Sequence, residues 1–226
     1  MRILALLLTL LCLLPGHAPA GAWPRAQGTW FVASDMRLSW PQDLTRWTST
    51  LPVAQYYTVY AEYGLSRHMT LGLDLGRSVS GGGKSVLFLR MPLPDLPRHT
   101  KLAVDLGLGQ IDGRAVLRPG LSLGHSVAMF GLQGWLAADG AAELAPLSKR
   151  ADLKLDLTFG LTLNNRGTKV IVQMQTGRPS QFAPFARLAP SVVFPFGRNR
   201  LAELGVTYGL RGDDSFGLKM GLWQSF

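Results

Sequence analysis

Few residue pairs in this 226-residue chain could carry out chemistry, and the clearest is His125 next to Ser126. A serine becomes a nucleophile for acyl transfer when a nearby histidine accepts its proton. Neighbouring residues of a β-strand point to opposite faces, however, so this pair on a strand could not share a proton. His68 and His99 lie where turns meet expected strands, which predicts solvated side chains. The sequence therefore predicts no catalytic residues and no enzyme.

Metal and cofactor sites are not expected either. The only cysteine is Cys12, and no histidines and cysteines are spaced like the ligands of a metal ion. Asp213 and Asp214 form one acidic pair, which we interpret as part of a tight hairpin turn. The sequence thus predicts no disulfide framework, no metal and no cofactor.

Charged side chains are the remaining chemical feature, and many of them alternate with apolar residues. This alternation assigns eight acids to the polar faces of expected strands, namely Asp35, Glu62, Asp74, Asp105, Asp139, Glu143, Asp156 and Glu203. It assigns nine bases to the same faces, namely Arg37, Arg90, Lys101, Arg118, Lys154, Lys169, Arg187, Arg211 and Lys219. The sum is 9 − 8 = +1, close to neutral. Such charges form either a structural network of salt bridges or the lining of a polar channel for small hydrophilic solutes.

The elements that carry these charges have a period of two. From Leu153 to Leu163 every second residue is apolar, and small, polar or charged residues stand between them. A helix would spread these leucines over its whole circumference, so the period indicates a strand. Twelve segments share it: 29–40, 55–64, 68–78, 85–91, 100–110, 115–123, 134–144, 153–164, 168–177, 186–196, 201–211 and 215–226. Turn residues separate the segments, and no linker or shift in composition divides the chain.

Residues 1–22 have the order of a secretory signal peptide. Met1-Arg2 is a basic start, Ile3 to Leu14 is apolar, and Pro15-Gly16 breaks this run, which is too short to span a bilayer. Ala18-Pro19-Ala20 and Ala20-Gly21-Ala22 both fit a cleavage site, so we expect cleavage near residue 20 or 22. Residues 23–226 would then form a single exported domain.

Both a soluble β-sandwich and a membrane β-barrel would contain alternating strands, and three features favour the barrel. First, the polar faces are small, with glycines such as Gly72, Gly107 and Gly160, as expected where strands surround a lumen. Second, large aromatic residues gather near strand ends, which is typical of the interfacial girdle of membrane barrels. These residues are Trp30, Trp40, Tyr57, Tyr63, Phe194, Phe196 and Trp223.

The third feature is the C-terminus, where Leu218, Met220, Leu222 and the final Phe226 lie an even number of residues apart. This pattern resembles the terminal assembly signal of bacterial outer-membrane β-barrel proteins, from which Gln224 departs because an apolar or aromatic residue is usual there. Residues 60–75 (YAEYGLSRHMTLGLDL) are similar to poorly characterised transporter-like or porin-like barrels of Gram-negative proteobacteria. The resemblance implies a closed antiparallel up-and-down transmembrane β-barrel of about 12 strands (10–12), inserted by the barrel-assembly machinery of the outer membrane.

For function, we expect a small polar pore or a transporter-like protein with a nearly charge-balanced lumen. A structural or interaction barrel with a closed lumen is the alternative, and an outer-membrane enzyme such as a lipase is less favoured. Twelve strands lie between packed barrels of eight strands and open porins of sixteen, so size alone does not decide. The connections are short, the longest being 41–54 and 124–133, which argues against a large plug.

The net charge of +9 lies mainly in turns and loops. One rim is expected to carry Arg25, Arg67, Arg98, Arg166, Arg198 and Arg200. The other is expected to carry Arg46, Arg77, Lys84, Arg114, Lys149, Arg150 and Arg178. Basic rims suit anionic phospholipid headgroups and lipopolysaccharide phosphates. An exported barrel does not meet nucleic acid, so outer-membrane lipids and lipopolysaccharide are the expected partners, with the oligomeric state left open.

Overall fold

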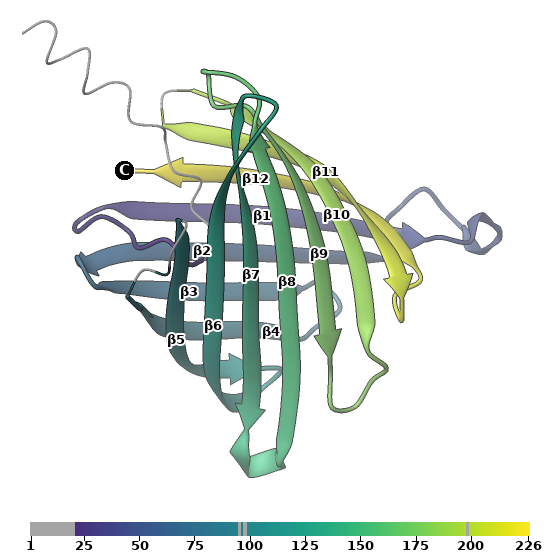
Figure 1. Cartoon of the computed structure of the whole chain (residues 1–226). Helices are drawn as coiled ribbons and strands as arrows, with labels where there is room; N and C mark the ends of the chain where they lie inside the picture. Colours follow the sequence, from purple (N-terminus) through teal and green to yellow (C-terminus); the bar gives the residue numbers. More distant parts are fainter. Residues whose placement is uncertain (1–20, 95, 97–98, 198) are drawn as a thin grey trace, which may run out of the picture.

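The computed structural model describes residues 21–94, 96, 99–197 and 199–226, so the expected signal peptide lies almost wholly outside the described residues. Twelve antiparallel strands close into one barrel, in which sequence neighbours pair and β12 pairs with β1 (Figure 1). The strands are β1 (Trp30–Pro41), β2 (Ala54–Ser66), β3 (Met69–Ser78), β4 (Gly83–Pro92), β5 (Thr100–Ile111), β6 (Arg114–Met129), β7 (Leu132–Ala145), β8 (Arg150–Thr162), β9 (Lys169–Arg178), β10 (Phe185–Pro195), β11 (Arg200–Arg211) and β12 (Ser215–Ser225). The predicted all-β, closed, up-and-down barrel of twelve strands is confirmed.

Closure depends on the pairing between the first and the last strand. Phe31 lies opposite Ser225 at one end of this pair, and Pro41 lies opposite Ser215 at the other. Just outside it, the Trp30 N–H donates to the Phe226 carbonyl at 2.7 Å, and the Phe226 N–H donates to the Trp30 carbonyl at 3.2 Å. The ladder is therefore continuous along the seam, which leaves no open edge there.

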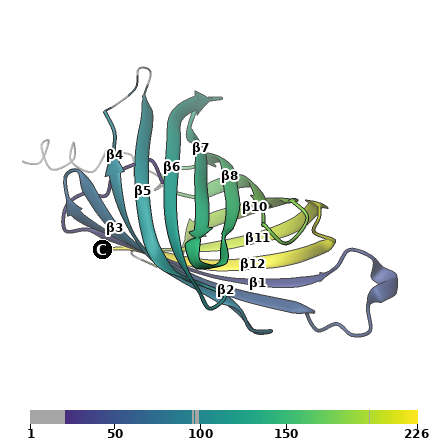
Figure 2. The same cartoon turned by 90° about the horizontal axis from the view of Figure 1, so that it is seen from below.

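An even number of strands places both ends of the barrel sequence at one end of the cylinder, which we call the terminal end. The opposite end, the far end, carries the β1–β2 connection with the short 3-10 helix η1 (Leu44–Arg46), which projects beyond the barrel (Figures 1 and 2). A second 3-10 helix, η2 (Pro146–Ser148), joins β7 to β8. No helix among the described residues is long and apolar enough to cross a membrane.

The hairpin of β6 and β7 is longer than the sequence predicts. We expected strands at 115–123 and 134–144 with a connection at 124–133, but β6 and β7 continue until Met129 pairs with Leu132. The turn is only Phe130 and Gly131, with φ of 54° and 75°. Two successive positive φ values are typical of the tight turn that matches strand twist in a hairpin. Glycine and alanine around this turn blur the apolar period, which is why the sequence places a loop there.

The apolar residues of the strands lie on the outside of the barrel. Leu108 is 64% exposed and Leu155 is 42% exposed, whereas Phe88 and Val193, on the inner face, are at most 1% exposed. A soluble protein would bury most of its leucines, so an outer wall of exposed leucines and valines requires apolar surroundings. The two-residue period therefore places most charged strand residues inside and most leucines outside.

Aromatic side chains gather at both ends of β1. At the terminal end Trp30 packs on Tyr63 and Phe226, with ring centroids 4.7 and 6.4 Å away. At the far end Trp40, Trp47 and Phe216 stack on one another at 5.6–6.4 Å. Trp223 is an exception to the expected girdle. It lies on the inner face of β12, as do Gly217, Lys219 and Gly221, from which it is separated by an even number of residues. Its indole N–H donates to Glu203 at 3.0 Å.

The orientation of β8 can be tested by placing a charge on each of its faces. We expect Leu157→Arg to destabilise the barrel in lipid by about 2–4 kcal/mol, because Leu157 is exposed on the outer wall near the middle of the strand. Thr158→Gln on the inner face should change stability by much less. Urea unfolding in lipid vesicles, followed by heat-modifiable gel mobility, measures both. Equal stability of Leu157→Arg and wild type would mean that the register is shifted by one residue.

We expect an assembly defect when the C-terminal residue that completes the seam is changed. Phe226 completes the seam with Trp30, so its deletion, or replacement by aspartate, should reduce folded barrel in the membrane severalfold and increase periplasmic degradation. Gln224→Ala, two residues earlier in the same strand, serves as the matched control and should assemble almost normally. Heat-modifiable protein in the outer-membrane fraction is the measurement, and wild-type amounts without Phe226 would contradict the prediction.

Candidate functional site: the interior of the barrel

Glycines on the inner face make room for large side chains from other strands. A Cβ atom added at Gly72 of β3 would overlap the ring of Phe88 on β4, and one added at Gly124 of β6 would overlap the indole of Trp23. Close approach of this kind is possible only where the wall has no side chain of its own. The interior is therefore filled from a subset of the strands rather than evenly from all twelve.

Glu62 of β2 is the centre of the first charged cluster. Its carboxylate lies 2.6 Å from Arg90 Nη1 and 2.5 Å from Arg25 Nε, and it accepts a hydrogen bond of 2.6 Å from the Tyr60 hydroxyl. Arg90 also approaches Asp105 at 3.4 Å. Glu62 is only 4% exposed, so both arginines are required to neutralise its charge away from water.

A second cluster surrounds Asp74 of β3. Arg118 Nη1 lies 2.6 Å from its carboxylate, and Lys84 Nζ lies at 2.8 Å. The ring of Phe88 separates the first two clusters and contacts both, because the guanidinium carbons of Arg90 and Arg118 lie 5.0 and 5.4 Å from its centroid. Cation–π attraction adds to the ion pairs in this water-poor region.

The opposite wall carries a third cluster around Glu203 of β11. Lys219 Nζ lies 2.8 Å from Glu203 and 3.8 Å from Asp35, and Trp223 donates its indole N–H to the other oxygen of Glu203. Glu203 is 2% exposed. The three clusters together leave little free space along the walls that carry them, because their carboxylates are almost inaccessible to solvent.

Two further ion pairs lie toward the far end. Lys154 Nζ lies 2.7 Å from Glu143, and Arg187 Nε lies 2.6 Å from Asp213 in the β11–β12 turn. Burial alone would raise the pKa of Asp213, but hydrogen bonds from Ser215 and the charge of Arg187 outweigh burial and hold this pKa below its ordinary value. Lys154 remains 42% exposed, which makes it the most solvent-accessible partner among these interior pairs.

The structure brings most of the sequence-derived candidates together. Eleven of the seventeen charged residues assigned to the inner faces form ion pairs with other described residues: Asp35, Glu62, Asp74, Arg90, Asp105, Arg118, Glu143, Lys154, Arg187, Glu203 and Lys219. Arg37 instead packs over the ring of Tyr56, with its guanidinium carbon 5.9 Å from the centroid. Asp156 forms no ion pair with any residue in the described part of the chain, and it lies opposite Asp139 in the β7–β8 register.

Three bases are not where the sequence places them. Arg25 and Lys84, expected on the rims, reach into the interior and neutralise Glu62 and Asp74. Arg211, expected inside, is exposed, because the β10–β11 register shifts between Ala186 and Arg187 and the bulge breaks the two-residue period. A local period cannot reveal a bulge or a side chain that turns inward from a strand end.

The histidines do not form a site. His125 Nδ1 lies 2.8 Å from the hydroxyl of Thr100, its neighbour on β5, and adjacent Ser126 faces the other side of the strand. His68 and His99 are exposed in turns. Within residues 21–94, 96, 99–197 and 199–226, no three or more metal-ligating side chains gather where they could hold a metal ion.

The terminal half of the barrel contains an apolar constriction. Trp135, Ala137, Ile171 and Val193 form its buried centre, and Trp23, Leu201 and Trp223 pack against it. Trp23 belongs to residues 21–28, which precede β1 and which we call the inner segment. The sequence predicts no such plug, since this segment is short and contains no strand or helix pattern.

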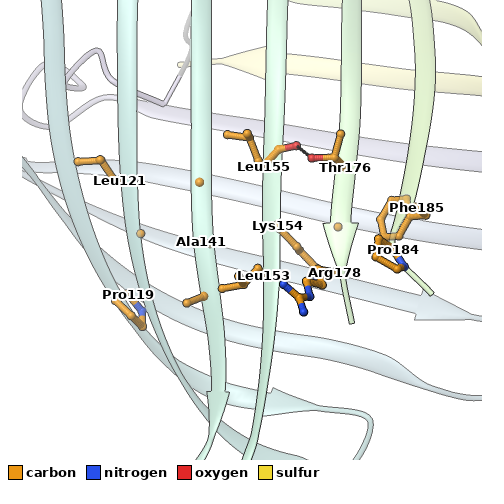
Figure 3. Close-up of a pocket in the computed structure, with 14 residues that line it drawn as sticks. Pro119, Leu121, Ala141, Leu153, Lys154, Leu155, Thr176, Arg178, Pro184 and Phe185 are labelled. Carbon is orange, nitrogen blue, oxygen red and sulfur yellow. Dashed lines mark hydrogen bonds between the residues drawn. The ribbon is translucent and has the colours of Figure 1, made fainter. Parts of the chain in front are cut away.

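The outer wall carries a groove of about 700 Å³ over β6 to β10 (Figure 3). Outward-facing Leu121, Leu153 and Leu155 border it. Gly140 and Ala142 lie between them, and their small size creates the depression. Arg178 lies at one end, and Thr176 donates its hydroxyl hydrogen to the Leu155 carbonyl at 2.8 Å. The groove is thus a depression in the apolar outer surface, and Lys154 and Arg178 are the basic residues among those that line it.

Comparison with known proteins identifies the architecture. The sequence matches no protein-family model and no curated protein. Among solved structures, the KdgM porin aligns with a TM-score of 0.58 and 9% identity, over 86% of this chain and 99% of that one. The NanC porin aligns with a TM-score of 0.61 and 8% identity, over 84% and 98%. The COG4313 outer membrane channel from Pseudomonas putida F1 aligns with a TM-score of 0.54 and 9% identity, over 93% and 100%.

The fold is that of the outer-membrane porins. At such low identity the likeness concerns the path of the backbone and the closed barrel, and it does not extend to individual side chains.

We expect a large loss of stability when the central carboxylate of the first cluster is removed. Glu62→Gln leaves Arg25 and Arg90 without their shared counter-ion, and breaking a buried ion pair from one side typically costs about 3–5 kcal/mol. Asp43→Asn, in the exposed β1–β2 connection, should have an effect near zero. The free energy of unfolding in lipid or detergent, measured by urea titration, distinguishes them. A Glu62→Gln barrel as stable as Asp43→Asn would contradict the structural role of this cluster.

Proposed function

We propose that the protein is an integral outer-membrane pore or transporter-like barrel for small polar solutes. The observation that carries this proposal is a closed twelve-strand cylinder with an aliphatic outer wall and charged side chains inside. A membrane barrel needs an apolar exterior to contact lipid, and a polar interior is useful where polar solutes pass. The shared fold with porins and an outer membrane channel supports the same assignment.

The interior charges would act on solutes through their arrangement rather than their sum. Most carboxylates have an adjacent base, so the lumen has little net charge but strong local fields between paired groups. Such a lining favours dipolar or zwitterionic solutes over simple ions of either sign. Lys154 is the partner most able to meet them, because its ammonium remains accessible.

A barrel with a closed lumen is the second candidate, and one observation favours it. The constriction around Trp135 and Trp23 is apolar and largely buried, so it opposes the passage of polar solutes at the terminal half. An enzyme is not proposed, because His125 and Ser126 cannot act together. Signal-peptide removal and insertion by the barrel-assembly machinery belong to the same proposal.

The rims would contact anionic headgroups and lipopolysaccharide phosphates. Arg67, Arg166 and Arg200 of the terminal end, together with Arg46, Lys149 and Arg178 of the far end, carry this part of the proposal. Arg98 and Arg198 lie outside the described residues. Arg178 also lies at the end of the outer groove, where a phosphate and its acyl chain could be bound together.

Conductance in planar lipid bilayers tests the pore. The purified protein should open discrete channels, and Lys154→Glu should shift the reversal potential in a salt gradient toward cation selectivity, because it replaces an accessible positive charge in the lumen with a negative one. Arg46→Gln, in the projecting connection, is the control and should leave selectivity unchanged. Folded, membrane-inserted protein without any conductance would refute the pore and favour the closed barrel.

A further inference from the structure

The inner segment turns back into the barrel instead of continuing away from β1. The Thr29 N–H donates to the Ala26 carbonyl at 3.1 Å, and Gly28 has a φ of 80°. The Gly28 N–H then donates to the Gly64 carbonyl at 2.8 Å, which fixes the turn to the end of β2. This reversal directs residues 21–25 from the terminal end into the lumen.

Three residues of the inner segment, Arg25, Trp23 and Ala22, are packed inside the barrel. Arg25 pairs with Glu62 and lies over the ring of Phe31, with its guanidinium carbon 4.3 Å from the centroid. Trp23 packs against the apolar constriction, and its indole lies over Gly124. Ala22 is only 1% exposed. These contacts are those of a plug in the lumen, since Glu62 belongs to β2, Phe31 to β1 and Gly124 to β6.

Gly21, at the inner end of this segment, meets an acid without a counter-ion. A Cβ atom added there would overlap Asp139 Oδ1 and lie 2.8 Å from the Ser122 hydroxyl oxygen, so a larger residue would displace one of these side chains. Asp139 lies near the middle of β7 and opposite Asp156 of β8. Asp139 Oδ1 is buried without a hydrogen-bond partner, and neither acid forms an ion pair with another described side chain. Two neighbouring interior carboxylates that form no ion pair with a described side chain repel each other.

Removal of the signal peptide would supply that cation. Hydrolysis of the Ala20–Gly21 peptide bond by water leaves a carboxylate on Ala20 and an α-amino group on Gly21, which is mostly protonated near neutral pH. The first of the two expected cleavage sites, Ala18-Pro19-Ala20, ends at this bond. The second would remove Gly21 and Ala22 and leave both acids without a partner.

We propose that cleavage after Ala20 creates a Gly21 α-ammonium group that pairs with Asp139 and Asp156 and locks the inner segment inside the lumen. The segment is then a constriction installed by maturation, with Trp23 closing the apolar part and Arg25 completing the Glu62 cluster. The ion pair is independent of the pore, whereas the role as a constriction rests on the proposed function.

The identity and accessibility of the mature N-terminus test the ion pair. Mass spectrometry of protein extracted from outer membranes should find a chain that begins at Gly21, and a chain that begins at Trp23 would overturn the proposal. The folded protein is then treated near neutral pH with an aldehyde that reacts selectively with neutral α-amines. Because only the neutral amine reacts, an ion pair that favours protonation tenfold slows labelling about tenfold.

Variants separate the ion pair from simple burial. Labelling should become about tenfold faster or more in the Asp139→Asn/Asp156→Asn double variant, whereas Asp112→Asn in the far-end β5–β6 turn should remain as slow as wild type. If the double variant does not fold, Gly21→Val keeps both acids but displaces the terminus from Asp139, and it should label equally fast. Fast labelling of folded wild type, or the same slow rate in the folded variants, would overturn the proposal.

Single-channel recording tests the constriction. Trp23→Ala should raise conductance above that of wild type, because it removes an indole from the apolar cluster inside the barrel, while Trp47→Ala in the projecting connection should not. Unchanged conductance in Trp23→Ala would refute the constriction. Absence of conductance in every variant would refute the pore, and the labelling results would still decide on the ion pair.

Discussion

The backbone hydrogen bonds that close β1 onto β12 are the constraint on which the rest of the molecule depends. In lipid, an unpaired N–H or C=O group on a strand edge finds no water, and each costs several kcal/mol. A sheet of twelve strands can satisfy all of these groups only as a cylinder. Once closed, it has an outer face that must suit lipid and an inner face that must be filled or hydrated, and the two-residue period of each strand assigns every side chain to one of them.

The inner face meets this requirement with charges and glycines rather than with an apolar core. Buried carboxylates at Glu62, Asp74 and Glu203 each have at least one cationic neighbour within 2.8 Å. A single buried charge would be strongly unfavourable, but pairs that share hydrogen bonds are tolerated. Phe88 and the other interior rings then occupy the space that glycines leave free. Part of the interior is consequently occupied by paired charges and aromatic rings.

The fold could be predicted from the sequence because strand number, facing and closure all follow from local alternation. The face of Leu157 or Asp74 depends only on its position within one strand, so a period-two pattern is enough. The exceptions have several causes. The β10–β11 bulge moves Arg211, the tight turn at Phe130 and Gly131 extends a strand pair, and Trp223 faces inward despite its place near a strand end. Arg25 and Trp23 were missed because their partners lie on strands distant in the sequence.

The position of Trp23 also constrains the order in which the molecule can fold. The apolar cluster against which it packs consists of Trp135 and Ala137 of β7, Ile171 of β9 and Val193 of β10, so this surface does not exist until β10 is in place. Contacts between the ends of a chain are the slowest to form, since they require the longest loop to close. The inner segment therefore enters the lumen only after most of the cylinder has formed. Burial of its indole follows the formation of most of the barrel and is among the final events of folding.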